Sequence, residues 1–176
     1  MNEKMLLEIL QPSLVLFVTT GLLTIASAVV FKNKPIEARP TMWQGFVSAP
    51  HYVRAVVIWI LSAVGYNVWE CISAVRQGAN VAIAGAVAFV MVRILAGACI
   101  LKGHKWPRNV FQICGTLAIA GGILERMTAS AHVWTAFSVN LVVNGIVGLV
   151  LYALLAMDES VKWRDAVRTA RIEKQQ

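Results

Sequence analysis

Five long apolar blocks divide this chain, and they constrain its fold more than any other feature. They cover residues 6–31, 53–75, 80–101, 107–124 and 133–157. A helix of about 20 apolar residues crosses the hydrocarbon of a bilayer. Lipid offers no partner for a free backbone N–H or C=O, so such segments must be helical. We therefore expect an all-α membrane protein with about five transmembrane helices.

The composition agrees with that class. The chain of 176 residues is 58% hydrophobic and 14% charged, whereas about 25% of a soluble domain is charged. A net charge of +7 is compatible with a protein that binds nucleic acid. Here, however, the cations flank the apolar blocks, and the sequence has no recurring basic face with aromatic residues that could stack on bases. We expect contact with the lipid bilayer and no nucleic-acid partner.

The connections divide the chain into four parts. Residues 1–31 form an N-terminal transmembrane span, and residues 32–52 form a basic cytoplasmic linker. Within the linker, "TMWQGFV" at 41–47 is expected to form a short interfacial helix. Residues 53–157 hold four spans joined by tight turns, which favour an antiparallel four-helix unit. Residues 158–176 form a cytoplasmic tail.

The basic residues are unevenly shared between the two sides of the membrane. With five spans, one side of the membrane receives only three basic residues, Lys4, Arg76 and Arg126. The richer side receives Lys32, Lys34, Arg39, Arg54, Lys102, Lys105, Arg108, Lys162, Arg164, Arg168, Arg171 and Lys174. Cytoplasmic loops carry an excess of Lys and Arg, so this bias predicts an N-terminus outside and a C-terminus in the cytoplasm.

One cation, Arg93, lies inside an apolar block, eight residues before Leu101. At a rise of about 1.5 Å per residue it is about 12 Å from the inner boundary. The Arg93 side chain could extend toward the membrane surface or pack between helices. It could instead line a polar path through the membrane. Asn144 is predicted at a similar depth and is a candidate partner. Asn140 lies on the same helix face as Asn144. The two asparagines either hydrogen-bond to another helix or line a cavity.

Two further polar residues, Asn67 and Glu70, lie one turn apart in the outer third of the second block. Glu70 is expected to pair with Arg76 or Arg126 near the outer boundary. No acidic residue lies near mid-membrane, which argues against a proton-coupled pump.

The tail has the pattern of an amphipathic helix. Apolar residues recur at a spacing of i, i+4, i+7, namely Trp163, Val167 and Ala170. Arginines follow one position later, and we expect the helix to lie on the inner membrane face. The predicted contacts with lipid head groups or a partner are Lys102, Lys105, Arg108, Arg164, Arg168 and Arg171.

Small residues recur in three of the blocks. They include Ala96 and Gly97 in the third block, and the glycines Gly115, Gly121, Gly122, Gly145 and Gly148 in the last two. Small residues let helix backbones approach closely. Packing within one chain and self-association are both open interpretations.

Three local patterns carry a resemblance to a known group of proteins. They are a P-x-x-V-R start at Pro50, Val53 and Arg54, a G-x-x-W-x-R turn at Gly103, Trp106 and Arg108, and a polar segment with an aromatic residue at 160–164. The layout of residues 50–165 resembles small uncharacterised four-span bacterial inner-membrane proteins. The resemblance implies this architecture and the bacterial inner membrane, with no settled activity. The added first span departs from the pattern.

Motifs of catalysis and of metal or cofactor binding are missing from the sequence. It has no phosphate-binding glycine loop, HExxH, GxSxG or paired carboxylates, and no His pair at i, i+4. We therefore expect no enzyme, cofactor, metal or catalytic residue.

Two functions stay open. The first is a non-enzymatic membrane protein that acts through protein contacts in the bilayer, as a homo-oligomer or with a membrane-protein partner. An immunity, defence or secretion-system component would fit. The second is a small oligomeric channel or transporter with a path lined by Arg93, Asn140 and Asn144, which would favour anions. They differ in whether Arg93 is satisfied within the protein or faces water.

Overall fold

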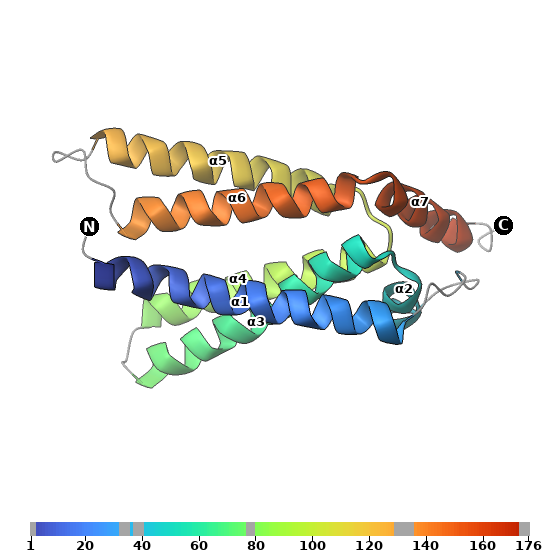
Figure 1. The fold of residues 1–176 in the computed structure, drawn as a ribbon, viewed down its shortest axis with the longest axis horizontal. Coiled ribbons are helices and arrows are strands. Elements are labelled where there is room, and N and C mark those ends of the chain that lie inside the picture. The colour runs from blue at the N-terminus through green and yellow to red at the C-terminus, as the bar shows by residue number, and fades with distance from the viewer. Residues whose placement is uncertain (1–2, 32–35, 37–40, 77–79, 129–135, 173–176) are drawn as a thin grey trace.

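The computed structural model describes residues 3–31, 36, 41–76, 80–128 and 136–172, and their regular structure is entirely helical (Figure 1). The helices are α1 (Glu3–Val30), α2 (Met42–Ser48), α3 (His51–Arg76), α4 (Asn80–Leu101), α5 (Trp106–Thr128), α6 (Ala136–Ala156) and α7 (Asp158–Ile172). The predicted all-α class is confirmed.

Three segments of the described chain are long and apolar enough to cross a membrane. They are His51–Trp69 in α3, Trp106–Thr128 in α5 and Ser138–Ala156 in α6. Shorter apolar stretches, Leu14–Val30 and Val90–Leu101, lie in α1 and α4. By length and composition, these three helices are candidate membrane spans and indicate a membrane protein. The complete count of five stays a prediction.

The helices are arranged as two antiparallel hairpins, with α1 along one of them. α3 pairs with α4, α5 pairs with α6, and α1 packs against α3. The two hairpins meet chiefly between α3 and α6 (Figure 1). The predicted four-helix unit thus consists of two closely packed pairs that have fewer contacts with each other.

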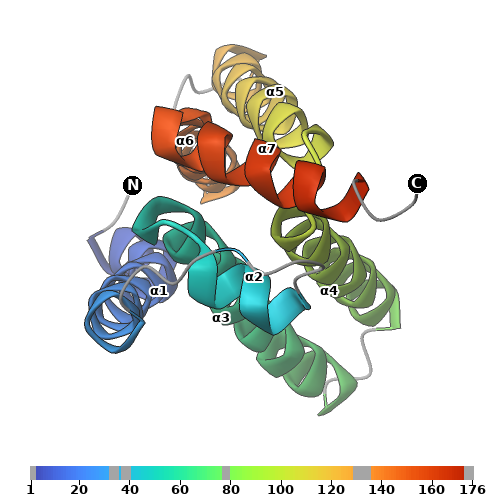
Figure 2. The same cartoon turned by 90° about the vertical axis from the view of Figure 1, so that its right-hand side faces the viewer.

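The core lies at the end of the molecule where α2 and α7 cross the ends of the longer helices (Figure 2). Its members come from the C-cap of α2, the first half of α3, the end of α4, the end of α6 and the inner face of α7: Ala49, Val53, Val56, Val57, Ile60, Ile100, Leu101, Leu151, Leu155, Trp163 and Val167. These side chains come from both hairpins and are buried against one another, so the core holds the two hairpins together at this end.

The short helix α2 begins where the linker sequence predicts one. The Thr41 hydroxyl accepts from the Gln44 backbone N–H at 3.2 Å, and the Gln44 carbonyl Oε1 accepts from the Thr41 N–H at 2.8 Å. This reciprocal pair is a capping box, which satisfies two backbone donors at a helix start. A Cβ on Gly45 would lie 2.9 Å from the Leu101 carbonyl oxygen, so glycine lets α2 reach the end of α4.

Glycine also explains why α5 and α6 pack so closely. A Cβ on Gly115 would lie 2.9 Å from the Gly145 carbonyl oxygen, and one on Gly145 would lie 2.7 Å from the Gly115 carbonyl oxygen. A Cβ on Gly122 would lie 2.7 Å from the carbonyl oxygen of Ser138. Packing within one chain is therefore confirmed for these small residues of α5 and α6.

The turn between α4 and α5 has a glycine in the left-handed region, Gly103 with φ of 79°. The Gly103 N–H donates to the Ile100 carbonyl and the His104 N–H donates to the Cys99 carbonyl, both at 2.9 Å. These bonds form a Schellman motif, which satisfies the last carbonyls of a helix. The turn lies directly under α7, because a Cβ on Gly103 would be 2.9 Å from the Arg164 carbonyl oxygen.

The tail forms the predicted helix, but its apolar face packs on the protein. Trp163 is 7% exposed and Val167 is 0% exposed, and the Trp163 indole N–H lies 3.3 Å from the Ser48 hydroxyl. For these two side chains the expected contact with lipid is wrong. A period of 3.6 residues identifies an apolar face and cannot tell whether lipid or protein covers it.

Candidate functional site

Arg93, within the apolar helix α4, is hydrogen-bonded to the neighbouring helix α3. Its Nη1 donates to Asn67 Oδ1 at 2.7 Å and to the Ala63 carbonyl at 3.1 Å. Its guanidinium carbon also lies 5.8 Å from the centre of the Trp59 ring. Asn67 is 6% exposed. The charge is thus held between α3 and α4 by an amide oxygen, a carbonyl and an aromatic face.

The expected partner, Asn144, is replaced by Asn67. Depth along the helices made Asn144 a possible match, but α4 packs against α3 while α6 packs against α5. Only residues 77–79 lie between α3 and α4 in the sequence. So short a connection makes α3 the neighbour of α4, and a search of α3 for acceptors would have found Asn67.

Asn140 and Asn144 form a separate polar pair on α6. The Asn144 amide Nδ2 donates to the Asn140 backbone carbonyl at 2.9 Å and to Asn140 Oδ1. Both side chains are exposed although they lie within a candidate span. The structure therefore has two polar pairs, Arg93–Asn67 in one hairpin and Asn140–Asn144 in the other, whereas the sequence placed Arg93 and the α6 asparagines in one path.

The Asn140–Asn144 pair lies on a face of α6 whose exposure changes along the helix. At about 100° per residue, Asn140 and Asn144 lie on the same side of α6 as Leu151 and Leu155. The two leucines are buried in the core, whereas the two asparagines are exposed. The same face of α6 is therefore covered near α7 and open in its other half.

The predicted pairing of Glu70 stays a prediction. Glu70 belongs to α3, but its side chain is outside the described part of the chain. Arg76 and Arg126 are exposed near the ends of α3 and α5.

Arg54 is a second arginine within an apolar helix, where the sequence indicated a topology signal and a P-x-x-V-R pattern but no bond to another helix. It is 2% exposed, and its Nη1 donates to the carbonyls of Ser27 at 2.7 Å and Phe31 at 2.8 Å. These carbonyls lie at the C-terminal end of α1, where the partial negative charge of a helix end attracts cations. Arg54 therefore fastens α1 to α3. Its position as the second residue of the second apolar block, 53–75, was the available signal.

The six cations predicted to contact head groups or a partner have different surroundings. Lys102, Lys105 and Arg168 are exposed, and Arg108 and Arg171 are half-buried. Arg164 is 9% exposed. The exposed three agree with a surface role, whereas Arg164 and Arg108 line a cavity.

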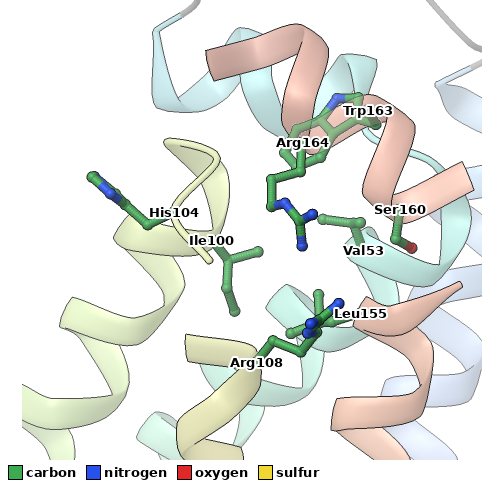
Figure 3. Close-up of a pocket in the computed structure, with 8 residues that line it drawn as sticks. All are labelled: Val53, Ile100, His104, Arg108, Leu155, Ser160, Trp163 and Arg164. Carbon is green, nitrogen blue, oxygen red and sulfur yellow. The ribbon is translucent and has the colours of Figure 1, made fainter. Parts of the chain in front are cut away.

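This cavity has a volume of about 20 Å³ and is lined by Val53, Ile100, His104, Arg108, Leu155, Ser160, Trp163 and Arg164 (Figure 3). It lies where the ends of α3, α4, α5 and α6 meet α7. The guanidinium groups of Arg108 and Arg164 point into this set of residues, whereas the His104 ring points away from it (Figure 3).

Within the described residues, no group of three or more His, Cys, Asp or Glu side chains is placed to hold a metal ion. Comparison with protein-family models, curated proteins and solved structures found no match to this chain. The geometry of the polar pairs and of the cavity is therefore what indicates the function of this chain.

Proposed function

We propose that this protein is a non-enzymatic, multi-span membrane protein that acts through protein contacts in the bilayer, and that it associates with a second copy through α6. The observation that carries this proposal is the exposed Asn140–Asn144 pair on a candidate membrane span. A membrane component of an immunity, defence or secretion system is the class of protein that this behaviour fits.

The proposed setting is the bacterial inner membrane, with α1, α3, α4, α5 and α6 as five spans. Large apolar side chains are exposed along these helices, including Leu22, Leu61, Leu95, Leu117 and Ile146. Soluble monomers rarely expose so much contiguous apolar surface. The excess of Lys and Arg at the α2 and α7 end supports a cytoplasmic C-terminus and an external N-terminus.

An exposed asparagine pair is costly in hydrocarbon unless another polar group contacts it. An amide has two N–H donors and an acceptor oxygen, and the bonds described for Asn140 and Asn144 lie within the pair. The Asn140 amide donors and the Asn144 carbonyl oxygen keep capacity for a further partner. Asparagine side chains join transmembrane helices in this way.

A second copy is the occupant that the chemistry favours. Asparagine amides both donate and accept, so the same pair on two copies related by a two-fold axis is self-complementary. The glycines of α5 and α6 are already used inside the chain. The polar pair is therefore the feature of this hairpin best suited to contact between copies.

The channel alternative is less well supported, because Arg93 has partners within its own hairpin. A path that selects anions needs a cation facing water, whereas Arg93 donates to Asn67 and to the Ala63 carbonyl. The Asn140–Asn144 pair belongs to the other hairpin.

The test compares the oligomeric state of wild type and the double variant Asn140→Leu/Asn144→Leu in lipid nanodiscs or mild detergent. We expect wild type to be dimeric and the double variant to be monomeric and folded. The matched control is Gln112→Leu, which removes an exposed amide from α5 and should leave the dimer intact.

A monomeric wild type would overturn the self-association, and so would a double variant that is as dimeric as wild type. Anion flux in proteoliposomes that is abolished by Arg93→Gln would overturn the proposal in favour of a channel.

A further inference from the structure

We propose that Arg108 and Arg164 form a binding site for a phosphate group at the α7 end of the molecule. Both guanidinium groups line the same cavity of about 20 Å³ (Figure 3). The site is distinct from the Asn140–Asn144 pair, because its two arginines come from α5 and α7 and neither asparagine lines the cavity.

Two cations share this cavity without an acidic side chain among the eight residues that line it. The carboxylate of Asp165 lies 3.4 Å from Arg164 Nε, and its side chain is half exposed beside the cavity. Arg164 itself is nine-tenths buried. Two like charges that are brought together away from water repel each other, and their desolvation costs free energy. The exposed carboxylate of Asp165 offsets only part of this cost. A bound anion would offset the rest.

Arg108 has capacity left for such a ligand. Its guanidinium carbon lies 5.8 Å from the centre of the Tyr152 ring, which holds one face of the group. Its Nε is buried and has no hydrogen-bond partner among the described residues. Arginine presents its N–H donors in a planar fork that matches the oxygens of a phosphate.

The size and position of the cavity indicate how the phosphate is presented. About 20 Å³ is room for little more than one water-sized group, so a phosphate would insert an oxygen while the rest of the ligand stays outside. The cavity lies at the ends of α3, α5 and α6, each of which has a candidate span. Lipid phosphates occupy this level of a bilayer. An anionic lipid is the favoured source, and free inorganic phosphate shares the same chemistry.

The test measures the affinity of the purified full chain for phosphatidylglycerol, with phosphatidylcholine for comparison, by native mass spectrometry. We expect Arg108→Gln and Arg164→Gln each to weaken phosphatidylglycerol binding about tenfold, because each removes charge-assisted bonds to the phosphate. The matched control is Arg168→Gln, which removes an exposed cation one turn further along α7 and should bind as wild type does.

Arg164 is buried, so its variant is also checked by thermal unfolding, and Arg108→Gln carries the test if Arg164→Gln does not fold. Competition by inorganic phosphate with the same arginine dependence would identify a free anion as the source. No competition, with the arginine dependence kept, would identify the lipid. Arg108→Gln binding as wild type does would overturn the site, and so would an equal loss in Arg168→Gln.

Discussion

At the residue scale, two arginines in apolar helices are satisfied in the same way, by oxygen atoms of an adjacent helix. Arg54 donates to two carbonyls at the end of α1, and Arg93 donates to Asn67 and to a carbonyl of α3. A buried guanidinium without such acceptors would be strongly destabilising. Each arginine therefore determines which helices lie side by side.

Arg54→Gln tests this bond at α1. Glutamine is shorter and uncharged, so the Ser27 and Phe31 carbonyls would lose charge-assisted donors that contribute about 1.5–3 kcal/mol each. We expect a clear fall in the thermal unfolding temperature in detergent and faster proteolysis of α1. Lys102→Gln, at an exposed lysine, should leave both unchanged. An Arg54→Gln protein as stable as Lys102→Gln would contradict this role.

Gly145→Ala tests the close packing of α5 on α6. The added methyl would lie 2.6 Å from Ile119 Cγ1 and 2.7 Å from the Gly115 carbonyl oxygen. Overpacking of this kind costs about 1–3 kcal/mol, which exceeds the gain in helix propensity of about 1 kcal/mol. We expect a lower unfolding temperature.

The matched control for this change is Gly65→Ala, where no atom lies within 4 Å of the added methyl. It should be neutral or stabilising, since only the helix propensity changes. Equal effects of the two substitutions would show that α5 and α6 are not in close contact.

At the element scale, α7 acts as a cover over the ends of the longer helices (Figure 2). Its Trp163 and Val167 complete a core built from α3, α4 and α6. Its backbone lies against the Gly103 turn between the two hairpins. α7 therefore contributes to holding the hairpins together, besides carrying basic residues.

Trp163→Ala tests this role. Removal of a buried tryptophan typically costs about 3–5 kcal/mol, so we expect a large loss of thermal stability and greater exposure of the Val53 and Ile100 region to proteolysis. Arg168→Ala changes an exposed residue of the same helix and should shift stability little. If both variants unfold at the wild-type temperature, α7 is not part of the core.

The elements that could be predicted from the sequence are those with local signals. The Thr41 and Gln44 spacing is a capping box, and the period of Trp163 and Val167 identifies α7. The partner of Arg93 could not be predicted from depth, because depth does not say which helices are neighbours. The burial of Arg164 was also missed, since the same amphipathic pattern suits a lipid surface and a protein surface.

At the scale of the whole molecule, two hairpins meet at the α7 end and α6 changes its surroundings along its length. Leu151 and Leu155 are buried between the hairpins, whereas Asn140 and Asn144 on the same side of α6 are exposed. An open polar face in the other half of a candidate membrane span is the basis for the proposed contact between two copies.

Cysteine cross-linking in native membranes tests this contact most directly. In a background with Cys71, Cys99 and Cys114 replaced by alanine, Val147→Cys keeps both asparagines and lies within about 60° of them around α6. It is compared with Ile146→Cys, at an exposed residue about 100° from Val147 around α6. We expect mild oxidation to give a disulfide-linked dimer for Val147→Cys and little or none for Ile146→Cys. Equal cross-linking at both positions, or none at residue 147, would contradict association through this face.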